Sequence, residues 1–294
     1  MDLTKLELFV TAANTCNLTQ AAQTLGYTQS GASHILNSLE NELGGIALFQ
    51  RGHHGLTLTA EGERLLPYAQ EMIYWYHQMT QTAQLLSKAP VGLLRIAGFT
   101  SILTPWMPII LKAFQEQYPN VEFQTLQGNY LDIEQWVLSG QADCGFVRLP
   151  AHSSLSTTFL KEDPLLLVLP QDHPLAKQEE ISLKDLQGEA FIRTTKGRFA
   201  DVSSLMEQYQ LTFSYPYIMH DYRSVLSLVE AGVGISIIPQ MTLQLYSPKV
   251  CVRTLKEQPI RHIALATRNI KRISPLTKAF LETTQALFRQ GLLQ

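Results

Sequence analysis

Apolar residues recur at helical spacing from the first residues of the chain. The first pattern predicts an amphipathic helix, whose buried face consists of Leu3, Leu6, Phe9, Val10 and Ala13. A second, short helix is expected from Thr19 to about Leu25, where Gly26 ends it because glycine readily adopts the left-handed conformation. Thr28 is a suitable N-cap for a third helix. The apolar residues of that helix are Ala32, Ile35, Leu36, Leu39 and Leu43.

The spacing of the second and third helices fits a helix-turn-helix. Ala22 is small enough to let the two helices approach, Gly26 makes the turn, and Ile35 holds the second helix across the first. Residues 48–58 then contain an apolar pair, a glycine-containing turn and an alternating apolar run, which predicts a small two-stranded wing. The N-terminal region is therefore expected to be an all-α winged helix-turn-helix domain.

From residue 59 the pattern is helical again. Thr59 is the expected N-cap, and Glu61 and Glu63 lie in the first turn, where the helix dipole favours acidic residues. The apolar positions alternate between spacings of four and three at Leu65, Ala69, Met72, Tyr76, Met79, Ala83 and Leu86. This repeat is typical of a coiled-coil seam and predicts pairing of two chains, whereas packing on its own domain is the alternative. Pro67 predicts a local bend.

The rest of the chain, after a hinge expected at residues 87–92, alternates between predicted strands and helices. Strands are expected at residues 93–99, 121–126, 142–147, 165–169, 191–193 and 235–238. Helices are expected at residues 105–117, 131–138, 221–231 and 275–289. This alternation indicates an α/β fold with open, mostly parallel sheets.

Composition sets broad limits. Hydrophobic residues make up 45% and charged residues 16% of the 294 residues, which is ordinary for a globular protein. No apolar run reaches about 18 residues, so no contact with a membrane is expected. The N-terminus lacks the features of a signal peptide, which predicts a cytoplasmic protein. The three cysteines, Cys16, Cys144 and Cys251, are far apart, so no disulfide is expected.

The sequence also lacks the common catalytic motifs. It contains no G-x-S-x-G, no phosphate-binding loop, no H-E-x-x-H and no Cys/His zinc spacing. Cys144 falls in a predicted buried strand, where a nucleophile would be inaccessible. We therefore expect no enzyme activity, no catalytic residue, no metal site and no cofactor.

Several blocks of the sequence resemble the LysR family of bacterial transcriptional regulators. The N-terminal half contains Phe9-Val10-xx-Ala13, Leu18-Thr19-xx-Ala22-xx-Leu25, Thr28-Gln29-Ser30-xx-Ser33 and Leu36-xx-Leu39-Glu40-xx-Leu43-Gly44. The C-terminal half contains Leu138-xx-Gly140-xx-Asp143, Asp172-His173-Pro174-Leu175-Ala176 and Gly232-Val233-Gly234-Ile235. The resemblance covers the whole chain.

The resemblance implies a DNA-binding transcriptional regulator in three parts. A winged helix-turn-helix domain would occupy residues 1–58, a linker and dimerisation helix residues 59–88, and an effector-binding domain residues 89–294. The last domain is similar to periplasmic binding proteins, with a cleft between two lobes. The first lobe would consist of about residues 91–161 and 267–294, and the second of about residues 162–266. The expected partners are double-stranded promoter DNA, a small-molecule effector and further copies of the chain, as a homodimer or homotetramer.

In such a domain the third helix would enter the major groove with its N-terminal end first. The candidate DNA contacts of this helix and the wing are Thr28, Gln29, Ser30, Ser33, His34, Asn37, Arg51 and His53. Gln and Asn pair with adenine, and Ser bonds to several base edges or to phosphate. Residues 1–88 hold four basic residues against seven acidic ones. Many family members carry proline at Ser30 and basic residues at His34 and Asn37, so the wing and backbone N–H groups are expected to meet more of the phosphate here.

Ligands in α/β folds of this kind lie at strand ends and helix starts. The candidate effector contacts at such places are Thr100, Ser101, Arg148, Arg193, Thr194, Thr195 and His220. The short segments around the hydroxyl and cationic candidates contain no carboxylate, so a small anionic effector is expected. A redox-sensing regulator of the same fold that uses Cys144 or Cys251 is the alternative.

Overall fold

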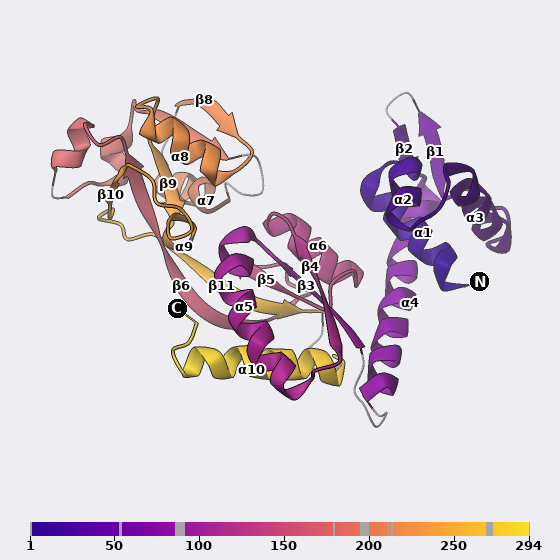
Figure 1. Ribbon diagram of the computed structural model, residues 1–294. Coiled ribbons are helices and arrows are strands. Elements are labelled where there is room, and N and C mark those ends of the chain that lie inside the picture. Colours follow the sequence, from indigo (N-terminus) through magenta and orange to yellow (C-terminus); the bar gives the residue numbers. More distant parts are fainter. Residues whose placement is uncertain are drawn as a thin grey trace. The chain divides into compact units, whose positions relative to one another are not determined.

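The chain folds as two compact units (Figure 1). The first consists of Met1–Lys88 with Ser139–Gln141, and the second of Ala89–Leu138 with Ala142–Gln294. Each unit has its own hydrophobic core. The computed structural model describes residues 2–52, 55–85, 92–178, 180–194, 200–210, 212, 214–268 and 273–293.

The first unit is a winged helix-turn-helix followed by a long helix. Its elements are α1 (Leu3–Thr15), α2 (Leu18–Thr24), α3 (Gln29–Glu42), β1 (Phe49–Gly52), β2 (Gly55–Leu58) and α4 (Ala60–Leu85). The side chains of Asp2, Asn17 and Thr28 cap the first three helices. Thr59 Oγ1 accepts a hydrogen bond from the N–H of Gly62 at 2.9 Å, which caps α4. β1 and β2 pair antiparallel, so the predicted winged helix-turn-helix fold and the long helix after it are confirmed.

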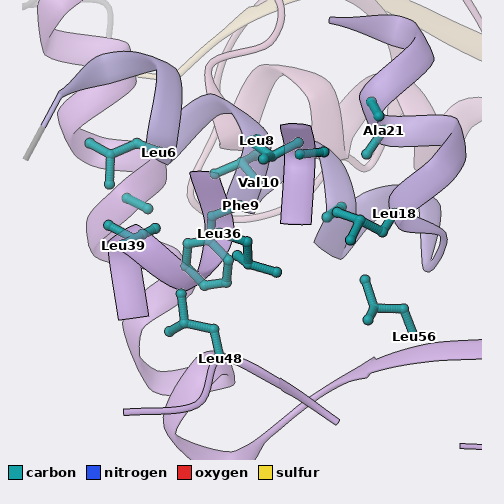
Figure 2. Close-up of a cluster of buried hydrophobic side chains, with 14 of the residues drawn as sticks. Leu6, Leu8, Phe9, Val10, Leu18, Ala21, Leu36, Leu39, Leu48 and Leu56 are labelled. Atoms are coloured by element: carbon teal, nitrogen blue, oxygen red, sulfur yellow. The ribbon is translucent and has the colours of Figure 1, made fainter. Parts of the chain in front are cut away.

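The core of the first unit joins these elements. The Phe9 ring of α1 meets the Phe49 ring of β1 edge-on, with centroids 5.6 Å apart. Figure 2 shows Phe9 of α1 in a cluster of buried side chains that also come from α2, α3 and β2. α4 adds Ala69 and Ile73 to the same cluster. Truncating a buried leucine such as Leu39 to alanine costs about 2–5 kcal/mol, so this packing rather than the wing alone fixes how α3 is presented.

The first lobe of the second unit is a parallel sheet covered by helices. Its elements are β3 (Gly92–Gly98), α5 (Thr100–Gln117), β4 (Val121–Gln127), α6 (Tyr130–Ser139), β5 (Cys144–Leu149) and α10 (Pro275–Arg289). β3 pairs parallel with both β4 and β5. Phe114 of α5 packs on Phe280 of α10, with ring centroids 6.0 Å apart. The C-terminal helix therefore belongs to the same lobe as the first strand.

The second lobe is built on shorter elements. They are η1 (Pro174–Lys177), η2 (Leu183–Leu186), β7 (Ala190–Thr194), α7 (Ala200–Tyr209), β8 (Ser214–Met219), α8 (Tyr222–Glu230), β9 (Ser236–Pro239), α9 (Gln240–Leu243) and β10 (Cys251–Arg253). β7 and β8 pair parallel. Phe191 and Ile235 lie fully buried in its core, and Val225 and Val229 fix α8 against the sheet.

Two long strands, β6 (Ser156–Leu169) and β11 (Ile260–Thr267), connect the lobes. β11 pairs antiparallel with β5 of the first lobe and with β6. The C-terminal part of β6 pairs antiparallel with β9 and β10 of the second lobe. Figure 1 shows β6 running from one lobe into the other. We call β6 and β11 the connecting strands.

Two details of the sequence-based expectation are wrong. The sheets are not mostly parallel, since β6 pairs antiparallel with β9, β10 and β11. The apolar pattern of a buried strand does not encode the direction of its neighbour. The helix expected from residue 105 begins at Thr100 and contains Pro105 inside it. A proline there removes one helical hydrogen bond, a cost that burial of Ile102 and Trp106 on the same helix offsets.

Candidate functional site

The polar side of α3 faces away from the core of the first unit. Gln29, Ser30, His34 and Asn37 are exposed, and Ser33 is half-buried. These five residues, which we call the α3 polar face, lie opposite the buried residues Ala32, Leu36 and Leu39. The helix therefore presents amide, hydroxyl and imidazole groups together on one accessible side.

Thr28 and Lys5 fix the ends of this helix. Thr28 Oγ1 accepts a hydrogen bond from the N–H of Gly31 at 3.1 Å. Lys5 donates from Nζ to Ser38 Oγ at 2.9 Å and forms an ion pair with Glu42. The hydrogen bond from Lys5 lowers the pKa of the Glu42 carboxyl. Lys5 thus ties α1 to α3, and its positive charge is already matched by a carboxylate.

The structure describes only part of the wing. Its backbone pairing places Arg51 opposite Leu56 and Gln50 opposite Thr57. The candidate His53 lies outside the described residues. The antiparallel pairing nevertheless fixes β1 and β2 as the hairpin that follows α3.

α4 divides the predicted seam between two environments. Ala69 is buried and Leu65 half-buried in the core of the first unit. The seam residues Met72, Tyr76, Met79 and Ala83 are exposed, while Leu86 lies outside the described residues. The same exposed side includes two aromatic residues that the seam pattern left out, Tyr68 and Trp75. The N-terminal half of α4 therefore packs on its own unit, and the exposed apolar residues lie on another side of the helix, mostly in its C-terminal half.

A cleft in the second unit is lined by both lobes and by a connecting strand. It encloses about 500 Å³ of empty space, part of which is open to solvent. The first lobe contributes Thr100, Ser101 and Tyr130 at the starts of α5 and α6. The second lobe contributes residues around the start of α8 and the end of α9, and β11 contributes Arg261. Side chains from both lobes and from a connecting strand therefore face one shared space.

Arg261 lines this cleft and is only 2% exposed. Its Nε donates to Asp163 Oδ2 on β6 at 3.1 Å, and its Nη2 forms an ion pair with the same oxygen. Nη1 donates to Tyr130 Oη at 2.7 Å, and Nη2 donates to Ser101 Oγ at 3.3 Å. Asp163 Oδ1 accepts from the N–H of Met241 in α9 at 3.0 Å. One buried pair thus joins the connecting strands to both lobes.

Hydroxyl groups of the first lobe accept hydrogen bonds from neighbouring side chains. Tyr130 and Ser101 accept from Arg261, and Thr100 Oγ1 accepts from Gln127 Nε2 at 2.9 Å. A hydroxyl that accepts one bond still carries its own O–H. The N-cap of α5, Phe99, provides no side-chain cap, which leaves the first N–H groups of that helix available to an acceptor. This wall therefore suits the oxygens of an anion.

The wall from the second lobe has a different character. The Asp221 carboxylate caps α8, accepting from the N–H of Ser224 at 2.9 Å and from its Oγ at 3.0 Å. Thr242 is 3% exposed, and its hydroxyl has no hydrogen-bond partner among the described residues. The rest of this wall is formed by Tyr222, Leu245 and Tyr246. It therefore combines a carboxylate and an unpaired hydroxyl with a largely apolar surface.

The predicted effector contacts are distributed unevenly around this cleft. Two of them line it, Thr100 and Ser101. Three lie on strands and are not among its lining residues: Arg148 of β5, and Arg193 and Thr194 of β7. His220 is exposed and directly precedes Asp221, and Thr195 lies outside the described residues. The sequence suggested donors alone, whereas the structure adds the Asp221 carboxylate.

Sequence reasoning missed the pair of Arg261 and Asp163 and their partner Tyr130. The local pattern marked neither residue as buried, because Asp163 follows Lys161 and Glu162 in a charged stretch and Arg261 lies beside His262. The two residues are 98 positions apart in the sequence, so their pairing became visible only in the sheet register.

The cysteines do not form a reactive cluster in the described part of the chain. Cys144 is fully buried in β5, and burial, with a smaller effect of Asp143, raises the pKa of its thiol well above the usual range. Cys251 is half-buried and Cys16 is exposed. Within the described ranges no group of His, Cys, Asp and Glu is arranged to hold a metal ion. No helix there is both long and apolar enough to cross a membrane.

A winged helix-turn-helix joined to a two-lobed domain with an internal cleft defines a class of protein, the DNA-binding regulators that carry a sensor domain. The family model for the bacterial regulatory helix-turn-helix protein, lysR family, matches residues 3–63. The model for the LysR substrate binding domain matches residues 87–289. The chain belongs to the LysR family and is a LysR-type DNA-binding transcriptional regulator with a substrate-binding domain.

Relatives and solved structures agree with this family. The uncharacterized HTH-type transcriptional regulator YvbU of Bacillus subtilis (strain 168) is 28% identical over 290 residues, covering 98% of this chain and 99% of that protein. The crystal structure of CbnR, a LysR family transcriptional regulator, shares the fold with a TM-score of 0.65 at 22% identity, covering 97% and 99% of the two chains. The regulatory domain of CcmR from Synechocystis PCC6803, in complex with 2-PG, has a TM-score of 0.61 at 25% identity, covering 67% and 97%.

Proposed function

We propose that this regulator binds promoter DNA through α3 and the wing and responds to a small effector with an anionic group, held in the cleft. The observation that carries the effector proposal is the arrangement around Arg261. Its guanidinium donates to the hydroxyl of Ser101, which therefore keeps its own proton for a ligand. The CcmR regulatory domain, which binds 2-PG, supports a ligand in the same domain here.

The DNA proposal rests on the α3 polar face. Gln29 and Asn37 would read base edges with their amides, and Ser30, Ser33 and His34 would bond to bases or phosphate. The DNA phosphate backbone would be contacted by Thr28, Arg51 and His53. Since Lys5 already pairs with Glu42, little positive charge in the described part of the first unit is left for phosphate. Engagement of one DNA by several such domains would compensate for weak binding by each.

Pairing of subunits is proposed for the uncovered side of α4. Met72, Tyr76 and Met79 are exposed apolar residues that a second α4 would bury, as the family's dimers imply. A homodimer built in this way, or a homotetramer built from two dimers, would bring DNA-binding domains together for two half-sites.

The proposed coupling runs through the connecting strands. Asp163 receives a hydrogen bond from Met241 of the second lobe, and its partner Arg261 reaches the first lobe. An effector that contacts both walls would favour one separation of the lobes over another. A differential affinity of about 1–3 kcal/mol between two states is enough for regulation.

A thermal-shift screen of the full chain with small carboxylates and phosphorylated acids tests the effector site. A true effector at a hundredfold excess over its Kd stabilises the protein by about 2.7 kcal/mol. Thr100→Val and Ser101→Ala should lose this response, while Ser227→Ala, exposed on α8 and not among the cleft residues, should keep it. If both cleft variants respond like the wild type, the effector does not bind at this wall.

A further inference from the structure

We propose that Thr242 determines the specificity of the cleft, and that it selects an anionic effector that also carries a neutral hydroxyl group. This inference rests on the proposed function and specifies its ligand. The anionic group of the effector would lie against the start of α5, and its hydroxyl group would bond to Thr242 in α9.

The hydroxyl of Thr242 is buried without a partner. The residue is 3% exposed and lines the cleft, and its Oγ1 has no hydrogen-bond partner among the described residues. A threonine in a helix often bonds to a carbonyl one turn earlier, as Thr284 does with the carbonyl of Phe280 at 2.8 Å. Because a buried hydroxyl without a partner costs stability, a ligand that bonds to Thr242 removes that cost.

The backbone that carries Thr242 is held on both sides. The N–H of Met241, the preceding residue, donates to Asp163 Oδ1 at 3.0 Å. The carbonyl of Thr242 itself accepts from the N–H of Leu245 at 3.2 Å. Rotation about χ1 is restricted in a β-branched side chain. The hydroxyl of Thr242 is therefore presented to the cleft from a fixed position, as a selective contact requires.

The surroundings of Thr242 favour a neutral group of the ligand over a second charge. Leu245 and Tyr246 line the cleft close to Thr242 in the chain. The Asp221 carboxylate on the same wall accepts from the N–H and the hydroxyl of Ser224. A charged group buried against Thr242 would lose its hydration in exchange for one neutral hydroxyl. A ligand hydroxyl loses less hydration, and it can donate to or accept from the hydroxyl of Thr242.

The first-lobe wall provides the contact for the anionic group. Ser101 Oγ accepts from Arg261 Nη2 at 3.3 Å and keeps its own proton for a ligand. The uncapped start of α5 adds backbone N–H groups at the same wall. A molecule with an anionic group here and a hydroxyl at Thr242 would contact both lobes, as the proposed coupling through the connecting strands requires.

The stability of the ligand-free protein gives the first test. Thr242→Val removes an unpaired hydroxyl and nearly keeps the shape of the side chain, so the melting temperature should stay the same or rise. Thr277→Val is the matched control, because the fully buried Thr277 hydroxyl lies 2.9 Å from Ser274 Oγ, and its removal should lower the melting temperature. An equal loss in both variants would show that the Thr242 hydroxyl is already paired in the free protein, and would overturn the inference.

Matched sets of anions give the second test, by calorimetry and thermal shift on the full chain. The first set is propionate, lactate and β-hydroxypropionate, and the second is butyrate, β-hydroxybutyrate and γ-hydroxybutyrate. Further sets are cyclohexanecarboxylate with its β- and γ-hydroxy derivatives, and ethyl phosphate with hydroxyethyl phosphate. In at least one set, a hydroxy compound should bind about tenfold or more tightly than the plain anion. Thr242→Val should remove this preference, and Thr242→Ser, which keeps the hydroxyl, should retain most of it.

The outcomes separate this inference from the proposed function. If plain anions bind as tightly as their hydroxy partners and lose affinity in Ser101→Ala, the role of Thr242 is refuted and the cleft site stands. If the hydroxy compounds bind best but Thr242→Val keeps the full preference, their hydroxyl lies elsewhere and the inference is wrong. If no compound of any set binds, the cleft is not a site for small anions and both proposals fail.

Discussion

The buried pair of Asp163 and Arg261 gives the sharpest test of how the two lobes are held. Their side chains are 0% and 1% exposed, so removing either charge leaves the other one buried without a partner. Asp163→Asn keeps an oxygen for the N–H of Met241, which now lies 3.0 Å from the carboxylate, but removes the charge opposite Arg261. Breaking a buried ion pair from one side costs about 3–5 kcal/mol. With an m-value of about 2 kcal/mol/M, the urea midpoint should fall by about 1.5–2.5 M.

The assay is tryptophan fluorescence during urea unfolding of the full chain. In a Trp75→Phe background the remaining tryptophans, Trp106 and Trp136, both lie in the second unit and report its unfolding. Glu180→Gln, which breaks an exposed ion pair with Lys256, is the matched control and should leave the midpoint unchanged.

The double variant Asp163→Asn with Arg261→Met decides whether charge is the cause. Because it leaves no unpaired charge, it should recover most of the loss, as replacement of buried pairs by apolar residues does. A midpoint for Asp163→Asn within about 0.3 M of the wild type would refute this reasoning. So would a double variant that is less stable than the single one.

Three further predictions follow from which side chains are buried and which are exposed. Met72→Asp should lower the mass measured by light scattering without unfolding the first unit. Ala69→Asp should instead destabilise that unit by roughly 2–4 kcal/mol, because Ala69 lies in its core. An unchanged mass for Met72→Asp would place the pairing surface elsewhere. Gln29→Ala should reduce discrimination between operator and random DNA by about 1–3 kcal/mol in gel-shift titrations, and equal losses on both DNAs would show that Gln29 does not read bases. Alkylation of the native chain should reach the exposed Cys16 long before the buried Cys144. Because burial raises the pKa of the Cys144 thiol in the folded chain, the stability that this thiol contributes is complete below the ordinary thiol pKa and declines as the pH rises above it. Unfolding measured at increasing alkaline pH tests this decline.

Local sequence was sufficient for the first unit. The spacing from Leu3 to Leu43 predicted α1, α2 and α3 to within a residue or two, because each helix is short and its cap and apolar face lie in adjacent positions. The polar side of α3 was also visible, since exposure on a helix follows directly from its period. The seam on α4 was harder to interpret. Apolar spacing alone does not distinguish Ala69, which packs on its own unit, from Met72, which does not.

The second unit depended on its tertiary structure. The sequence by itself determined that strands and helices alternate there, that Thr100 and Ser101 follow a strand, and that the chain resembles the LysR family. Only the sheet register decided that β6 and β11 run antiparallel between the lobes and place Asp163 opposite Arg261. Only the cleft decided that Asp221 and Thr242 face the same space as Ser101. The physical reason is that hydrophobic periodicity records which side of an element is buried, whereas the partner of a buried charge is set by contacts between residues far apart in the chain.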